Sequence, residues 1–179
     1  MITISHYAAT CAKYGMDAVA ISSPDGTYTS WDVLTNKTNP QTIDAVLYAE
    51  LSVKLYWELK YGGLFGLNAI FPKSLPAGTY LSANYGGSPP NCTVENTKFV
   101  FTRLTVPTTE QLNQDVYHCG SRTLPHERLI IPGLEGCWAT VSLANMTNNG
   151  DVPAAQQAVA VERLQNILTC PPESVYSGY

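Results

Sequence analysis

The side chains best able to do chemistry in this chain are five cysteines and three histidines. A cysteine becomes a catalytic nucleophile when a histidine contacts it in the fold and removes its proton. His6 precedes Cys11 on a short predicted helix, whereas His118 directly precedes Cys119, so those two side chains should diverge. His126 could reach a cysteine only through the tertiary fold. No local cysteine-enzyme signature surrounds any of them, which favours structural cysteines over a catalytic one.

The cysteines also bear on the compartment in which the protein is made. Their number is odd, so at least one must be free. In a reducing compartment all would be small buried hydrophobic residues, whereas a secreted chain could form two disulfides whose pairing the sequence does not reveal. We favour the reduced state at this point. The cysteines are Cys11, Cys92, Cys119, Cys137 and Cys170, and the N-x-S/T sequons lie at Asn36, Asn91 and Asn145.

Other kinds of chemical site find little support. No C-x-x-C or H-x-x-x-H spacing is present, so we expect no metal site. Glu50 and Glu58 could exchange protons if buried, but Lys54 lies between them, and the alternation is more typical of a solvated, ion-paired stripe. The glycine-rich segments GGLFG and YGGSPP match no phosphate-binding motif. We therefore expect no cofactor and no catalytic residue.

The composition indicates one globular domain over residues 1–179 with a neutral surface. Apolar residues make up 45% of the 179 residues, and charged residues only 13%, against roughly a quarter in ordinary soluble domains. Eleven tyrosines add to this picture, since interfaces are enriched in Tyr and depleted in Lys and Glu. The net charge of −4 and the absence of a basic run argue against nucleic acid. No uncharged apolar stretch is long enough to span a membrane.

One long stretch, Asn39 to Gly62, carries conflicting signals. Asn39 can cap a helix, Pro40 suits its first position, and Gly62 suits its end. Yet apolar residues occupy every odd position from Ile43 to Tyr61, which is the period of a half-buried strand. A strand of that length would span about 60 Å, so length and caps favour a helix. Because apolar residues would cover most of its circumference, we expect it to be buried nearly all round, with only Glu50, Lys54 and Glu58 reaching water.

The remaining pattern predicts an α+β fold. A mostly antiparallel sheet is expected to pack on the long central apolar helix (about 40–61), with a C-terminal helix at about 152–169. The predicted hairpin at 17–34 surrounds the turn Ser23-Pro24-Asp25-Gly26, and further strands are expected at 79–85, 98–106, 128–131 and 136–144, with shorter helices at 3–13 and 108–120. The alternative for the central stretch is a short helix to about Glu50 followed by a strand.

Low charge, abundant tyrosine and an apolar segment at 62–78 favour a non-enzymatic structural subunit that forms a homo-oligomer or a larger assembly, as a virus or phage particle protein does. The alternatives are a secreted binding or effector domain with two disulfides, and a small hydrolase with a Cys-His or carboxylate site. The N-terminal residues lack the basic start and apolar centre of a signal peptide, so reduced intracellular synthesis, that of a virion protein included, is slightly favoured over secretion. The predicted interface residues are Tyr28, Trp31, Leu64, Phe65, Phe71, Tyr176 and Tyr179. Tyr80 and Tyr85 are further candidates for an aromatic binding face.

Overall fold

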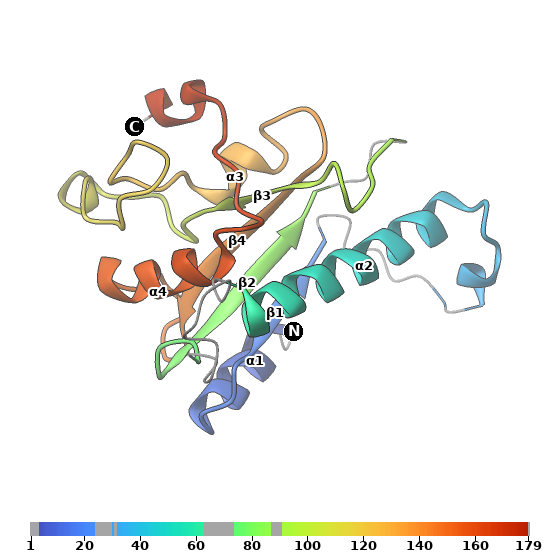
Figure 1. The fold of residues 1–179 in the computed structure, drawn as a ribbon, viewed down its shortest axis with the longest axis horizontal. Coiled ribbons are helices and arrows are strands. Elements are labelled where there is room, and N and C mark those ends of the chain that lie inside the picture. The colour runs from blue at the N-terminus through green and yellow to red at the C-terminus, as the bar shows by residue number, and fades with distance from the viewer. Residues whose placement is uncertain (1–3, 24–29, 31, 63–73, 87–90, 179) are drawn as a thin grey trace.

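The structure of the chain is a computed structural model that describes all residues except 1–3, 24–29, 31, 63–73, 87–90 and 179 (Figure 1). The predicted α+β class is confirmed: the described residues form a mixed sheet of four strands with four helices. None of the described helices has the length and apolar character needed to cross a bilayer. The elements are α1 (Ile4–Lys13), β1 (Val19–Ser22), α2 (Pro40–Tyr61), β2 (Thr79–Tyr85), β3 (Lys98–Phe101), α3 (Glu127–Ile130), β4 (Trp138–Asn145) and α4 (Ala154–Leu164), with 3-10 turns at Val33–Thr35, Thr109–Gln111 and Glu173–Gly178.

The sheet has the strand order β1-β2-β4-β3. The prediction of a mostly antiparallel sheet is wrong. Only β2 and β4 pair antiparallel, whereas β1 pairs parallel with β2 and β3 pairs parallel with β4. The physical reason lies in the connections. A two-residue turn joins antiparallel neighbours, but a long crossover returns the chain in the same direction. The segment between β1 and β2 contains the whole of α2, and among the described residues β1 pairs only with β2. Most of the predicted hairpin turn and return strand lies outside the described residues, and its last part belongs to the turn Val33–Thr35.

The long stretch is a helix, and its predicted start is confirmed. The Asn39 side chain accepts a hydrogen bond from Gln41 N at 2.9 Å, and Pro40 occupies the first helical position. The period-two pattern was misleading because the leucines that enter the core recur every four residues, at Leu47, Leu51, Leu55 and Leu59. The expected burial on nearly all faces is wrong: several apolar side chains on the other side of α2 are about half exposed.

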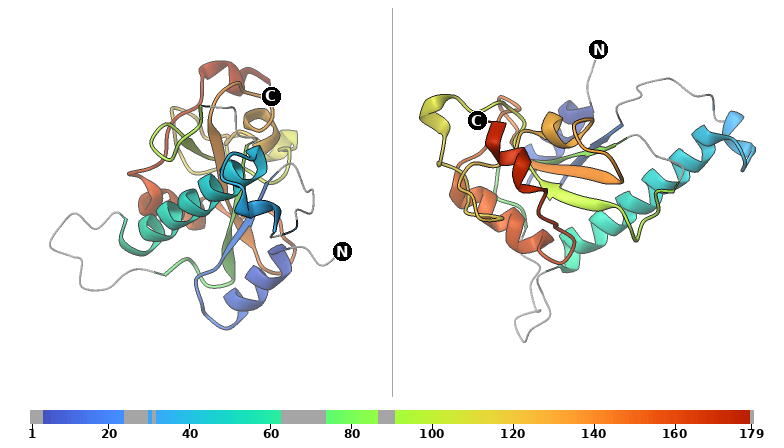
Figure 2. Two further views of the ribbon diagram at one scale, coloured as in Figure 1. Left: turned by 90° about the vertical axis from the view of Figure 1, so that its right-hand side faces the viewer. Right: turned by 90° about the horizontal axis from the view of Figure 1, so that it is seen from above.

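Two helical layers cover the two faces of the sheet (Figure 2). Because strand side chains alternate between faces, Leu81, Ala83 and Tyr85 of β2 join the main core beneath α2 and α4. Tyr80 points to the opposite face, where it packs with the alanines of α1. The buried state of Tyr80 and Tyr85, each 1% exposed, rules out the aromatic binding face predicted from them. Val100 and Ile130 form a third cluster beside α3.

Four predicted elements differ from the structure. The strand expected at 98–106 ends at Phe101. Residues 108–120 are helical only at Thr109–Gln111, because Asn113 and Cys119 adopt positive φ and Asp115 N donates to Arg122 O in a reversal of the chain. Residues 128–131 belong largely to α3 rather than to a strand. The C-terminal helix spans Ala154–Leu164 rather than 152–169.

The early end of α4 has a structural reason at the edge of the sheet. Leu168 bridges to Phe99 of the edge strand β3, and Thr169 N donates to Phe99 O at 2.7 Å. An exposed edge strand has unpaired backbone groups, so these bonds favour extended chain over further helix. Sequence periodicity alone could not reveal this competition.

Candidate functional site

The most extensive polar cluster lies at the centre of the irregular segment between β3 and α3. Asp115 Oδ2 accepts hydrogen bonds from Arg103 Nη1 at 3.0 Å and Leu124 N at 2.9 Å, while Oδ1 accepts one from Gln157 Nε2 at 2.9 Å. Asp151 accepts from Leu104 N at 2.8 Å and also lies 3.5 Å from Arg103 Nη2. Arg103 and Asp115 are 3% and 4% exposed. These contacts tie β3, α4 and the loop together, so the cluster serves the fold.

The cysteines form two disulfides, and the favoured all-reduced state is wrong for this structure. Cys92 pairs with Cys137 across 5.5 Å between Cα atoms, and Cys119 pairs with Cys170 across 5.4 Å. Cys11 is the remaining thiol. The Cys119–Cys170 disulfide links the loop after the Arg103 cluster to the chain beyond α4. The spacing of the cysteines in the sequence does not indicate this pairing.

The structure does not bring a described thiol and a described histidine ring together. Cys11 is half-buried on α1 and packs against the alanine cluster. The ring of His126 caps α3, because its Nδ1 accepts from Arg128 N at 3.2 Å, and its Nε2 lies 3.0 Å from Leu104 O. His118 adjoins a disulfide, and burial lowers the pKa of its ring. The side chain of His6 lies outside the described residues.

The predicted charged stripe on α2 is also different from expectation. Glu50 is exposed, but Lys54 is half-buried and donates to Val94 O at 2.9 Å. Glu58 is half-buried, with one carboxylate oxygen that has no hydrogen-bond partner. The described residues contain no group of three or more potential metal ligands.

A carboxylate that sequence reasoning missed is Glu127, at the start of α3. Burial raises its pKa, and its Oε2 accepts a hydrogen bond from Asn84 Nδ2 at 2.9 Å. Asn84 in turn contacts Ser22 of β1. The carboxylate therefore joins α3 to the polar face of the sheet, across the strands β1 and β2.

The predicted interface residues fall mostly on segments that are not described. Tyr28, Trp31, Leu64, Phe65, Phe71 and Tyr179 all lie outside the described residues. Tyr176 is half-buried in the turn Glu173–Gly178.

A different apolar surface is present on α2. Five side chains along its outer face, between 47% and 54% exposed, define what we call the α2 stripe: Ile43, Val46, Val53, Trp57 and Tyr61. Their spacings of three, seven, four and four residues place them on one side of a helix, opposite the buried leucines, with the exposed Glu50 between Val46 and Val53. The rings of Trp57 and Tyr61 stack with centroids 5.0 Å apart. The sequence contains these apolar residues at helical spacing. They were not predicted as a surface because nearly all apolar residues of this helix were expected to be buried.

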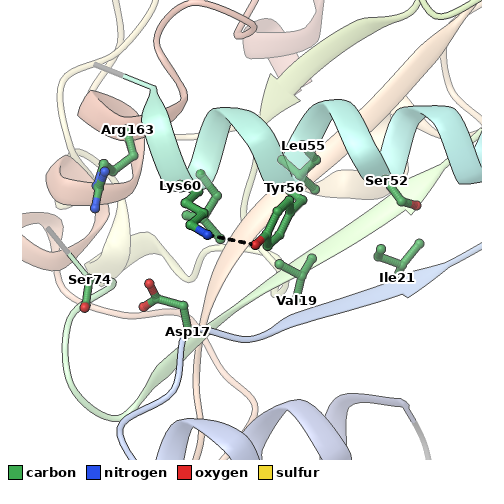
Figure 3. A pocket seen from close by; sticks show the side chains of 10 residues that line it. Asp17, Val19, Ile21, Ser52, Leu55, Tyr56, Lys60, Ser74 and Arg163 are labelled. Atoms are coloured by element: carbon green, nitrogen blue, oxygen red, sulfur yellow. Dashed lines mark hydrogen bonds between the residues drawn. The ribbon is translucent and has the colours of Figure 1, made fainter. Parts of the chain in front are cut away.

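A cavity of about 460 Å³ opens on the other flank of α2 (Figure 3). It lies between α2, the start of β1 and the end of α4, and its walls combine aliphatic and charged groups. The lining residues are Asp17, Val19, Ile21, Ser52, Leu55, Tyr56, Leu59, Lys60, Ser74 and Arg163.

Comparison with known proteins gives no match, whether to protein-family models, to the sequences of curated proteins or to solved structures.

Proposed function

We propose that this protein is a non-enzymatic assembly subunit that associates with further copies of itself through the α2 stripe. The observation that carries the proposal is the row of five half-exposed apolar side chains along one face of a regular helix. Figure 1 shows that the first turns of α2 extend past the sheet, where a second molecule can approach them. Scattered exposed apolar residues are normal, whereas apolar residues gathered along one helix face form a patch of the kind that often mediates contacts.

The order of side-chain sizes along the stripe favours a second copy in antiparallel orientation. The first half carries the aliphatic residues Ile43 and Val46, and the second half carries the aromatic residues Trp57 and Tyr61. A twofold axis near residue 52 would set each aliphatic half against the aromatic half of the other copy. A twofold interface uses one patch twice and requires this kind of self-complementarity.

The size of the stripe indicates weak association. From Ile43 to Tyr61 a helix rises about 27 Å, and a width of about 10 Å gives roughly 300 Å², well below the roughly 800 Å² per partner of a standard interface. Flanking residues must supply the rest. We therefore expect a dimer that dissociates on dilution, with a dissociation constant in the micromolar range or weaker.

Sedimentation equilibrium from about 10 μM to about 1 mM protein tests the proposal. The wild-type chain should show a concentration-dependent rise in mass, and Val53→Glu should abolish it by placing a charge at the centre of the stripe. Val106→Glu is the matched control, because Val106 is also exposed, at 64%, and lies outside α2. A wild-type protein that stays monomeric over the whole range contradicts the proposal, as does equal association of the two variants.

A second candidate is a secreted binding domain, and the two disulfides favour it. Such bonds form in oxidising compartments and are rare in the reducing cytosol. Intact mass with and without reductant, on protein isolated from its native source, tests this candidate. A mass increase of four hydrogens on reduction supports the secreted binding domain, and five free thiols before reduction exclude it.

A further inference from the structure

We propose that the cavity beside α2 binds a single-chain amphiphile with one carboxylate, the class of the fatty acids. The proposal concerns a different surface from the α2 stripe and does not depend on self-association. It is carried by one buried cation without a partner at the wall of an otherwise largely apolar cavity (Figure 3).

The cation is Arg163, near the end of α4. Its side chain lines the cavity, the residue is 4% exposed, and neither Nε nor Nη1 has a hydrogen-bond partner. A buried charge without compensation is costly in a folded protein. An anion in the cavity would supply the missing acceptors, and a carboxylate matches the planar fork of a guanidinium group with two oxygens.

The apolar part of the cavity indicates what is attached to that carboxylate. Val19 and Ile21 of β1 face Leu55 of α2, and Figure 3 places these side chains away from Arg163 toward the other end of the cavity. The Ser52 hydroxyl at that end is already engaged, since it donates to Tyr48 O at 2.6 Å. The surface there therefore offers a site for a hydrocarbon chain. A volume of about 460 Å³ falls within the usual range of small-molecule sites, about 300–1,000 Å³.

The remaining charges favour one negative charge over two. Lys60 is a second cation on the wall, and its Nζ donates to the Tyr56 hydroxyl at 3.3 Å. Asp17 opposes these cations, although its Oδ1 also accepts from Leu75 N at 2.7 Å. Two cations against one carboxylate leave a single positive charge to be neutralised. Glu58 lies nearby but does not line the cavity, and no ion pair joins it to Arg163 in the described structure.

Isothermal titration calorimetry, with decanoate kept below its critical micelle concentration, measures the affinity of the cavity for this ligand and so tests the proposal. Decanol and decyltrimethylammonium have the same chain with a neutral and a positive head. We expect decanoate to bind wild-type protein, and Arg163→Gln to weaken that binding about tenfold to a hundredfold, which is the range for losing a charge-assisted contact. Arg122→Gln, at an exposed arginine outside the cavity, should bind like wild type.

Thermal unfolding of Arg163→Gln separates a binding role from a structural one. If Arg163 serves an anionic ligand, the unliganded variant should unfold at the wild-type temperature or above, because an uncompensated charge has been removed. Undetectable binding of decanoate to wild-type protein overturns the proposal. Equal affinity for the three amphiphiles, unchanged affinity in Arg163→Gln, or a strongly destabilised variant overturns it as well.

Discussion

Removal of the Asp115 carboxylate should be among the most damaging single changes in this protein. In Asp115→Ala, Arg103 Nη1, Leu124 N and Gln157 Nε2 all lose their acceptor at distances of 2.9 to 3.0 Å. Hydrogen bonds to charged groups contribute about 1.5–3 kcal/mol each, but they are not additive, and breaking a buried ion pair costs about 3–5 kcal/mol. We expect a loss of about 3–5 kcal/mol in the free energy of unfolding, a large share of the about 5–15 kcal/mol of a typical domain.

The Arg103 side of the cluster sharpens the test. Arg103→Ala should cost at least as much, because it leaves both Asp115 and Asp151 in a buried site without their cation. The two substitutions share one interaction, so the double variant should lose clearly less than the sum of the single losses.

Guanidinium unfolding of the four proteins, with the disulfides intact, measures this cycle. A loss below about 1 kcal/mol for Asp115→Ala would show that the cluster is not an energetic centre. Additive single losses would show that Arg103 and Asp115 act independently, and either result would refute the reasoning.

Three further predictions concern the disulfides, the half-buried His118 and a close approach of the backbone. Replacing both Cys92 and Cys137 by serine should lower the free energy of unfolding by about 4 kcal/mol, which is the chain-entropy value for a loop of about 45 residues. Denaturant titration measures this loss, and a loss below about 1 kcal/mol would contradict the reasoning. Burial lowers the pKa of His118, so the unfolded chain binds the proton more tightly, and stability present above the ordinary pKa of 6.5 should be lost as pH falls through the lower folded value. Urea midpoints between pH 7.5 and 5 should therefore fall less steeply in His118→Gln, whereas parallel slopes would exclude this origin. Gly62→Ala would force a Cβ against the backbone oxygens of Glu58 and Arg163, so we expect the free energy of unfolding to fall by about 1–3 kcal/mol in the same assay. At Gly120 the space is open but φ is +81°, so Gly120→Ala should cost about 1 kcal/mol from the backbone conformation alone.

The α2 stripe shows how a correct helix can still lead to a wrong surface. End signals from Asn39 and Pro40 are local, so they identified the start of the helix without knowledge of its neighbours. Which face is buried depends on where the sheet lies. Only the packing distinguishes Leu55, at 0% exposed, from Trp57, at 54% exposed.

The cavity and the Arg103 cluster could not be predicted from the sequence either, because both depend on contacts between distant segments. Arg163 and Val19 come from opposite ends of the chain and line one cavity only because α4 packs against α2 in the tertiary fold. Asp115 and Gln157 likewise meet across a loop whose reversal depends on positive φ at Asn113 and Cys119. Periodicity describes one segment at a time and does not carry this information.

The sequence by itself determined the α+β class, the N-terminal cap of α2, the strand at 79–85 and, with a shift of two residues at its start, the strand predicted at 136–144, because propensity, caps and alternation act over a few neighbouring residues. Tertiary structure alone decided the parallel pairings, the disulfide partners and the separation of α2 into a buried leucine face and an exposed apolar stripe. These features depend on contacts between segments distant in sequence. Their free energy comes from burial and pairing that exist only once the chain has packed.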